Sequence, residues 1–110
     1  MTQLQSAVVR LSYLLTPPVS YTNGPKIFLP DPEKDTNVAF KTGLISQANL
    51  VLDTGLAVLA GDQSHQLSEF DDNQFDEIDS LLENDLDKGS FSALVNAVQA
   101  VVVEVNRTTT

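Results

Sequence analysis

The 110-residue chain has no cysteine, no tryptophan and a single histidine, His65. Without cysteine it has no disulfide, no thiolate metal site and no cysteine nucleophile, and no histidine spacing suits zinc. His65 has Ser64 and Glu69 nearby in the sequence, but the Gly-x-Ser-x-Gly turn that exposes a serine nucleophile is absent. No Gly-rich phosphate loop is present either. The sequence therefore predicts a protein that is not an enzyme and has no cofactor.

No metal site is predicted, although carboxylates are abundant. The run from Asn84 to Gly89 carries several side-chain oxygens, which are the ligands that calcium prefers. Placing Gly89 at the sixth position of an EF-hand loop puts Leu86 and Lys88 where ligands belong. The spacing excludes a calcium loop of that type.

Basic residues are scarce: six Lys and Arg face fifteen Asp and Glu, which gives a net charge of -9 and a pI near 4.1. The six bases are scattered along the chain rather than clustered. Binding to nucleic-acid phosphates or to anionic lipid needs clustered Lys and Arg. We therefore expect no direct contact with nucleic acid and none with a membrane surface.

Long apolar runs are also missing. The longest uncharged run, from Gly89 to Val103, has 15 residues and includes Ser, Asn and Gln, so it is too short and too polar to span a bilayer. The first residues lack the basic region of a secretory signal, and Arg10 interrupts their apolar stretch. These features predict a cytoplasmic or otherwise intracellular protein.

All five prolines lie between Pro17 and Pro32, and they divide the chain into two regimes. We expect one domain with an N-terminal element (1–15), a Pro-rich extended arm (16–41) and a helical body (42–110). Asn23-Gly24 is typical of a two-residue hairpin turn, although Pro25 removes a hydrogen-bond donor beside it. Within the arm, the apolar residues Ile27, Phe28 and Leu29 are the predicted anchor for partner contact.

The N-terminal element has two interpretations. Leu4, Val8 and Leu11 share one face of a helix, whereas Val9, Leu11 and Tyr13 alternate as in a strand. We favour the helix and keep the strand as the alternative.

A strong helical period begins at Gly43 and ends near Gly61, which can adopt the left-handed conformation that closes many helices. Its predicted apolar stripe uses steps of three and four residues and comprises Leu44, Ile45, Ala48, Leu52, Leu56 and Leu59, widened by Val51 and Val58. This helix is expected to be the most central one.

The chain's acids are concentrated in one block: ten of the fifteen lie between Asp62 and Asp87, where there is no Lys or Arg. Apolar residues repeat through the block at helical spacing, namely Phe75, Ile78, Leu82 and Leu86. We predict an amphipathic helix over 74–87 with Asn73 as its N-cap. Its acidic surface is predicted to comprise Asp76, Asp79, Glu83 and Asp87.

A final helix is predicted after Gly89, with Ser90 as its cap and an apolar stripe from Phe91 to Val105, although the valines from Val101 on leave a terminal strand open. It pairs antiparallel with the acidic helix through a link at Lys88-Gly89. The predicted fold class is mainly α, a small body of three to four helices with an extended arm. The alternative is α+β with an N-terminal strand and a short hairpin.

These features favour a protein-protein interaction or assembly module, an oligomeric structural subunit that contacts itself or neighbouring subunits of a complex. Coat and connector subunits of virus particles often combine an extended arm with a compact body, so a virion component is a specific form of this hypothesis. The alternative is an acidic regulator or inhibitor that occupies a basic nucleic-acid-binding site on a partner.

Overall fold

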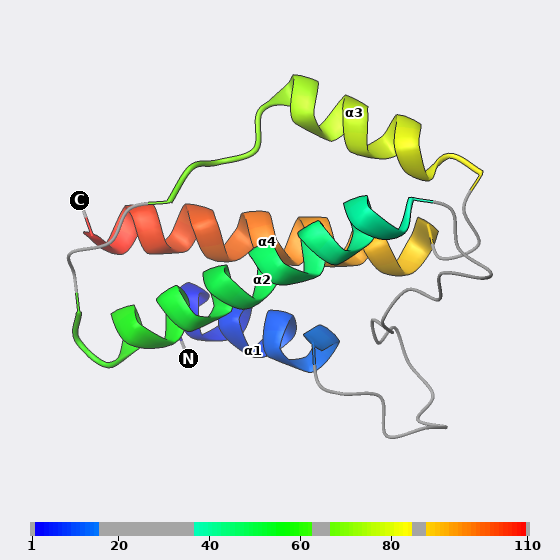
Figure 1. Cartoon of the computed structure of the whole chain (residues 1–110). Helices are drawn as coiled ribbons and strands as arrows, with labels where there is room; N and C mark the ends of the chain where they lie inside the picture. Colours follow the sequence, from blue (N-terminus) through cyan, green and yellow to red (C-terminus); the bar gives the residue numbers. More distant parts are fainter. Residues whose placement is uncertain (1, 16–36, 63–66, 85–87, 110) are drawn as a thin grey trace.

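The computed structural model describes residues 2–15, 37–62, 67–84 and 88–109. These ranges contain four helices and no strand, so the mainly α fold class is confirmed. The helices are α1 (Gln3–Leu15), α2 (Val38–Leu59), α3 (Asp72–Leu82) and α4 (Lys88–Thr109) (Figure 1). The predicted hairpin at Asn23-Gly24 and the anchor residues Ile27, Phe28 and Leu29 lie outside the described residues.

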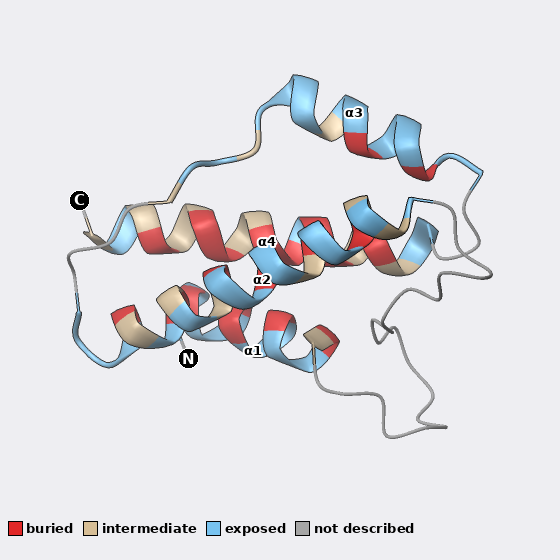
Figure 2. Cartoon of the chain, viewed as in Figure 1, coloured by how far each residue is buried: buried red, intermediate tan, exposed pale blue. Residues whose placement is uncertain are grey.

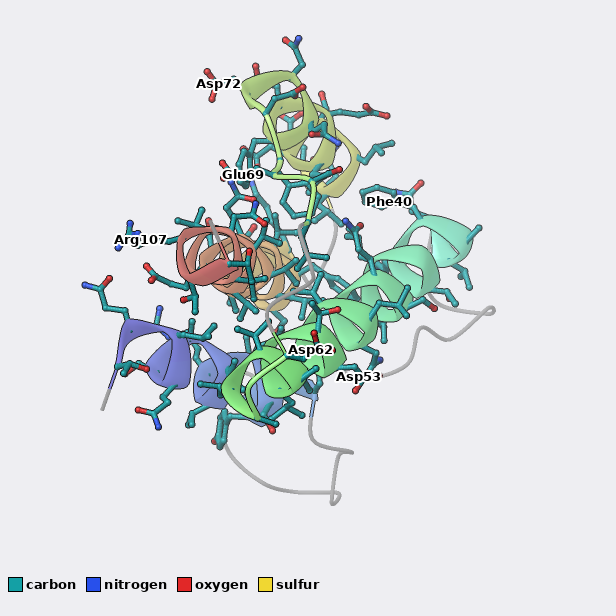
Figure 3. All side chains as sticks on the ribbon, turned by 90° about the vertical axis from the view of Figure 1, so that its left-hand side faces the viewer. Phe40, Asp53, Asp62, Glu69, Asp72 and Arg107 are labelled. Carbon is teal, nitrogen blue, oxygen red and sulfur yellow. The ribbon has the colours of Figure 1, made fainter. Side chains whose placement is uncertain are left out.

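Helices α1, α2 and α4 pack against one another, and α3 lies on the side of α4 opposite α1 (Figures 1 and 3). The Arg107 guanidinium at the end of α4 donates to Gln3 Oε1 at the start of α1, at 2.9 Å, so these two helices run antiparallel. Lys41 lies over the Phe91 ring and Gly55 lies against Val101, which makes α2 and α4 parallel. We refer to α1, α2 and α4 as the bundle.

The bundle encloses most of the core, and its buried residues repeat at steps of three and four along each helix (Figure 2). Helix α1 contributes Leu4, Ala7, Val8, Leu11 and Leu14, and α4 contributes Phe91, Leu94, Val95, Ala97, Val98, Val101, Val102 and Val105. This confirms the helical interpretation of the N-terminal element. Helix α1 starts with a capping box in which Thr2 and Gln5 exchange side-chain to backbone hydrogen bonds of 2.7 and 3.1 Å.

Gly55 of α2 lies against side chains of both α1 and α4. A Cβ built on Gly55 would lie 2.8 Å from Cγ2 of Val8 and 3.1 Å from Cγ1 of Val101. The first distance is shorter than real Cβ atoms show, so α1, α2 and α4 meet here because α2 has no side chain at this position. Gly55 thus sets the spacing of the bundle.

The buried face of α2 differs from the predicted one. It comprises Lys41, Leu44, Ala48, Val51, Gly55 and Val58, whereas Leu56 and Leu59 are 49% and 39% exposed and Leu52 is half-buried. The prediction followed side-chain hydrophobicity and so selected the flank of the face, because the residue at the centre of the contact is a glycine. Helix α2 also begins at Val38, five residues before the predicted Gly43. Its predicted stop is confirmed, since Gly61 has φ of 107°.

The acidic helix α3 is shorter than predicted. It ends at Leu82 with Glu83 as C-cap, so the predicted helix over 74–87 is wrong at both ends; Leu86 and Asp87 lie outside the described residues. Ile78 and Leu82 are buried and Phe75 is half-buried, as the amphipathic pattern predicted.

Helix α4 begins at Lys88, so Gly89 and Ser90 lie inside its first turn and neither ends α3 nor caps α4. The option of a strand from Val101 is wrong, since α4 continues to Thr109. The predicted antiparallel orientation of α3 and α4 is confirmed, because the two helices run in opposite directions (Figure 1).

Candidate interaction surfaces

Helix α3 starts at a rigid local structure. Asp71 is the N-cap, and its side chain accepts from Gln74 N while its own N–H donates to Gln74 Oε1, both at 2.8 Å. On either side of this capping box, the Phe70 and Phe75 rings meet edge to face with centroids 5.6 Å apart, which is the arrangement of a hydrophobic staple. The predicted cap, Asn73, is two residues too late. The pattern Phe-Asp-x-x-Gln-Phe was the sequence signal that identifies the correct one.

Four exposed carboxylates form one row on α3 and its C-cap, at steps of four, three and four residues: Asp72, Asp76, Asp79 and Glu83. We call this set the acidic row. Three of the four predicted surface acids belong to it, and the fourth, Asp87, lies outside the described residues. Asp76, Asp79 and Glu83 border a shallow hollow whose other lining includes the Lys88 side chain. Within the row the charges recur about every 5.5 Å along the helix axis, which is wider than the ~3.4 Å per phosphate along a DNA strand.

The segment before α3, residues 67–71, lies along α4, and we call it the strap. Asn106 accepts from Leu67 N at 2.8 Å and donates to Leu67 O at 2.7 Å. Gln99 accepts from Phe70 N at 2.9 Å and donates to Phe70 O at 3.4 Å. Each side-chain amide therefore satisfies both backbone groups of one strap residue, as a neighbouring strand does.

We call these four hydrogen bonds from Gln99 and Asn106 to the strap the clasp. The spacing of the two amide side chains matches the spacing of the two strap residues that they bind. Gln99 and Asn106 are seven residues apart on α4, about 10.5 Å along the axis, and Leu67 and Phe70 are three residues apart, about 10 Å in extended chain. The strap therefore runs antiparallel to α4 without strain in its register. This fixes where α3 begins.

The far end of α3 packs on α4 and is joined by a hydrogen bond to the residue before α2. The Lys41 side chain is fully buried, with Nζ 5.3 Å from the centroid of the Phe91 ring, and it makes further interactions as well. Asn37, in the left-handed conformation at the start of α2, donates from Nδ2 to the backbone oxygen of Leu81 at 2.9 Å. The residue before α2 thus stabilises the end of α3.

The other side of the molecule presents a nearly uncharged surface on α2. Leu50 is 69% exposed, and the charged residues of α2 are the buried Lys41 and the exposed Asp53. Exposed or half-buried residues repeat along α2 in steps of four and three, a set we call the outer row: Ala39, Gly43, Ser46, Leu50, Asp53 and Ala57. Figure 3 shows Asp53 on α2 and Asp72 on α3 on different sides of the molecule, with α4 between them.

The sequence analysis did not select Leu50, because it falls outside the apolar stripe predicted for α2. A second repeat, offset from the buried one by about half a turn, was the available signal: residues 39, 43, 46, 50 and 57 are all small or apolar. An isolated exposed leucine is ordinary, but α2 has three exposed leucines, Leu50, Leu56 and Leu59.

Nothing among the described residues groups three histidines or carboxylates closely enough to hold a metal ion. His65 lies outside those residues. By length and composition, one helix in the described part of the chain, α2, can cross a membrane, and 28% of its most apolar 18-residue window is buried. Comparison of the chain with protein-family models, with curated proteins and with solved structures finds no match.

Proposed function

We propose that the chain is a non-enzymatic assembly module, a structural subunit that contacts other protein subunits through the exposed side of α2. The observation that carries this proposal is the mismatch between the composition of α2 and its burial. A helix apolar enough to pass for a membrane span has 28% of that window buried within its own chain. Apolar surface of this kind is stabilised by a partner that covers it, at about 25 cal/mol per Å².

The distribution of charge supports contact on this side. The described part of α1 carries Arg10 as its charged residue, and α2 carries Lys41 and Asp53. The acidic row lies on α3, across α4. A partner subunit that covers α2 therefore does not have to desolvate the carboxylates that dominate the net charge of -9.

A protein surface suits α2 better than a bilayer does. Asp53 is exposed near the middle of the helix, and an Asp at the centre of a membrane helix costs about 2.5 to 3.5 kcal/mol for insertion. The outer row also exposes Ser46, and Gln47 lies beside it. Polar groups such as these are ordinary at protein interfaces.

The anchor predicted in the arm, Ile27, Phe28 and Leu29, is a second contact in this proposal. An apolar arm together with an apolar helix face provides two separate contacts with neighbouring subunits, as subunits of virus particles and other large assemblies require. The arm contact is independently testable by replacing Ile27, Phe28 and Leu29 with serine.

The test is the size of the complex in an extract of the native source, measured by gel filtration with light scattering. The wild-type chain is expected in a complex much larger than its own 11.9 kDa. A variant with Leu50→Glu and Leu56→Glu is expected to elute as a much smaller species, because the α2 contact is lost. Leu81→Glu is the matched control, since Leu81 is a 38% exposed leucine on α3.

Two outcomes contradict the proposal. The first is a wild-type chain that elutes as a monomer from the native extract. The second is a monomeric chain that floats with lipid vesicles, which would assign the apolar side of α2 to a membrane.

The second candidate is the acidic regulator, favoured by the presence of the acidic row on a capped, amphipathic helix. It predicts binding to a basic protein with steep salt dependence. Replacing Asp76, Asp79, Glu83 and Asp87 by Asn or Gln abolishes that binding if this candidate is correct, and leaves the α2-dependent complex intact if the assembly module is correct.

A further inference from the structure

The exposed side of α2 is self-complementary about Leu50. Leu50 is the most exposed of the described large apolar residues, at 69%, and lies near the middle of the 22-residue helix. Four residues before and after it stand Ser46 and Thr54, and seven residues before and after it stand Gly43 and Ala57. A two-fold axis needs such a surface, because each residue of the contact must fit its counterpart when the chain direction is reversed.

We propose that two copies of this chain pair through α2, with the helices antiparallel and crossing at Leu50. This inference rests on the proposed assembly function and names its partner as a second copy. In the pair, Leu50 packs on the partner's Leu50, and Gly43 faces the partner's Ala57. The small residues on both sides of Leu50 let the two helices approach closely.

The charge distribution favours a second copy on this face. Two chains of net charge -9 repel each other, and the repulsion is smallest where each surface carries little charge. Pairing through α2 keeps the two acidic rows on the outer sides of the dimer, because α3 lies across α4 from α2. The remaining like-charge pair is Asp53 with the partner's Asp53. In antiparallel pairing these residues lie about 9 Å apart along the helix axis, close to the Debye length of about 8 Å at physiological ionic strength.

The small contact area predicts a weak dimer, which dissociates at low protein concentration. A 22-residue helix is about 33 Å long, and a strip one helix wide buries less than the ~800 Å² per partner of a standard stable interface. Sedimentation velocity over a concentration series is therefore expected to show a monomer-dimer equilibrium. Leu50→Glu is expected to weaken it by at least about tenfold, and Asp53→Asn to strengthen it by a smaller factor.

The absence of cysteine allows a direct geometric test. Disulfides form when Cβ atoms come within about 3.5 to 4.5 Å, so Leu50→Cys is expected to cross-link to itself in the dimer. Gly43→Cys mixed with Ala57→Cys is expected to give the heterodimer. Gly43→Cys alone and the control Leu81→Cys are expected to stay monomeric on a denaturing gel.

Three outcomes of these experiments would overturn antiparallel pairing through α2. Self-cross-linking of Gly43→Cys would mean parallel pairing and overturn the antiparallel arrangement. If purified wild-type chain is a monomer at all concentrations while the Leu50→Glu/Leu56→Glu variant still loses the native complex, the partner is a different protein and the assembly function stands. If the purified chain dimerises but Leu50→Glu dimerises equally well, circular dichroism confirming that it is folded, the contact is elsewhere and the inference fails.

Discussion

The bundle and the acidic helix are held in place by different forces. Each bundle helix contacts both of the others through buried aliphatic side chains, with α1, α2 and α4 meeting at Gly55. Among the described helices α3 contacts α4 alone, through Ile78 and Leu82, and a cavity of about 120 Å³ remains between them. Much of what positions α3 is polar: the Gln99 and Asn106 clasp, the capping box and the Asn37 bond.

This difference has an energetic consequence. Apolar packing in the bundle is lost only when the helices separate, whereas hydrogen bonds at the surface contribute about 0.5 to 1.5 kcal/mol each and can be exchanged for water. The like charges of the acidic row further oppose α3 by a few tenths of a kcal/mol per neighbouring pair. We therefore expect α3 and the strap to open locally while the bundle stays folded.

The largest expected effect compares two leucines that are equally buried, both at 0% exposure: Leu11 in the bundle and Leu82 in α3. Leu11→Ala is expected to lower the free energy of unfolding by about 2 to 5 kcal/mol. Leu82→Ala is expected to cost about 2 kcal/mol or less, because α3 is free to settle onto α4. Urea denaturation followed by circular dichroism measures both. Equal losses would show that α3 is as firmly integrated as the bundle.

A pair of glycines in α2 tests the bundle contact. Gly55→Ala is expected to destabilise the protein by about 1 to 3 kcal/mol, since the added methyl overlaps Val8. Gly43→Ala meets nothing within 4 Å and is expected to stabilise it by about 0.5 to 1 kcal/mol through helix propensity. The same denaturation experiment checks the pair, and a stabilising Gly55→Ala would mean that the helices are further apart than described.

The clasp is tested by Asn106→Ala, with Asn96→Ala as the control because Asn96 is an exposed amide on the same helix. Loss of the two bonds to Leu67 is expected to lower the free energy of strap opening by about 1 to 2 kcal/mol. Hydrogen exchange should then accelerate about 5- to 30-fold in 67–82 and remain unchanged in α1 and α2. Uniform acceleration throughout the chain would remove the distinction between the two regions.

The smallest effect concerns salt. Raising ionic strength from about 0.01 to 0.15 M shortens the Debye length from about 30 to 8 Å, so repulsion within the acidic row decreases and Tm is expected to rise by a few degrees or less. Asp76→Asn with Asp79→Asn is expected to remove part of this rise. A Tm that is independent of salt in the wild type would indicate that the acids are already compensated.

The sequence was sufficient for the mainly α class and the order of the described helices, although it left their number at three to four, because apolar residues at steps of three and four are a direct consequence of burying one helix face. It was insufficient for which face of α2 is buried. Hydrophobicity scales give glycine little weight, yet Gly55 lies at the centre of the contact, and Lys41 is buried against an aromatic ring that is 50 residues away. Contacts between distant segments decide both positions.

The interaction surfaces were predictable to different degrees. Asp76, Asp79 and Glu83 were correctly expected to be exposed, since charged residues opposite an apolar stripe face the solvent when that stripe is buried. Leu50 was not selected, because it falls outside the apolar stripe predicted for α2 and a single exposed leucine is an ordinary feature of a protein surface. The strap was also missed: hydrogen bonds from Gln99 and Asn106 to an extended segment leave no periodic signal of their own.

The clasp between α4 and the strap determines how many residues the strap can contain. Two helical turns between Gln99 and Asn106 match three extended residues between Leu67 and Phe70, so the length of the strap is fixed while the identity of the residues within it is not. Ser68 and Glu69 are exposed, so substitutions at these two positions are expected to leave the clasp intact. Inserting or deleting one residue between them, by contrast, would shift Phe70 past Gln99 and move the whole acidic helix along the molecule.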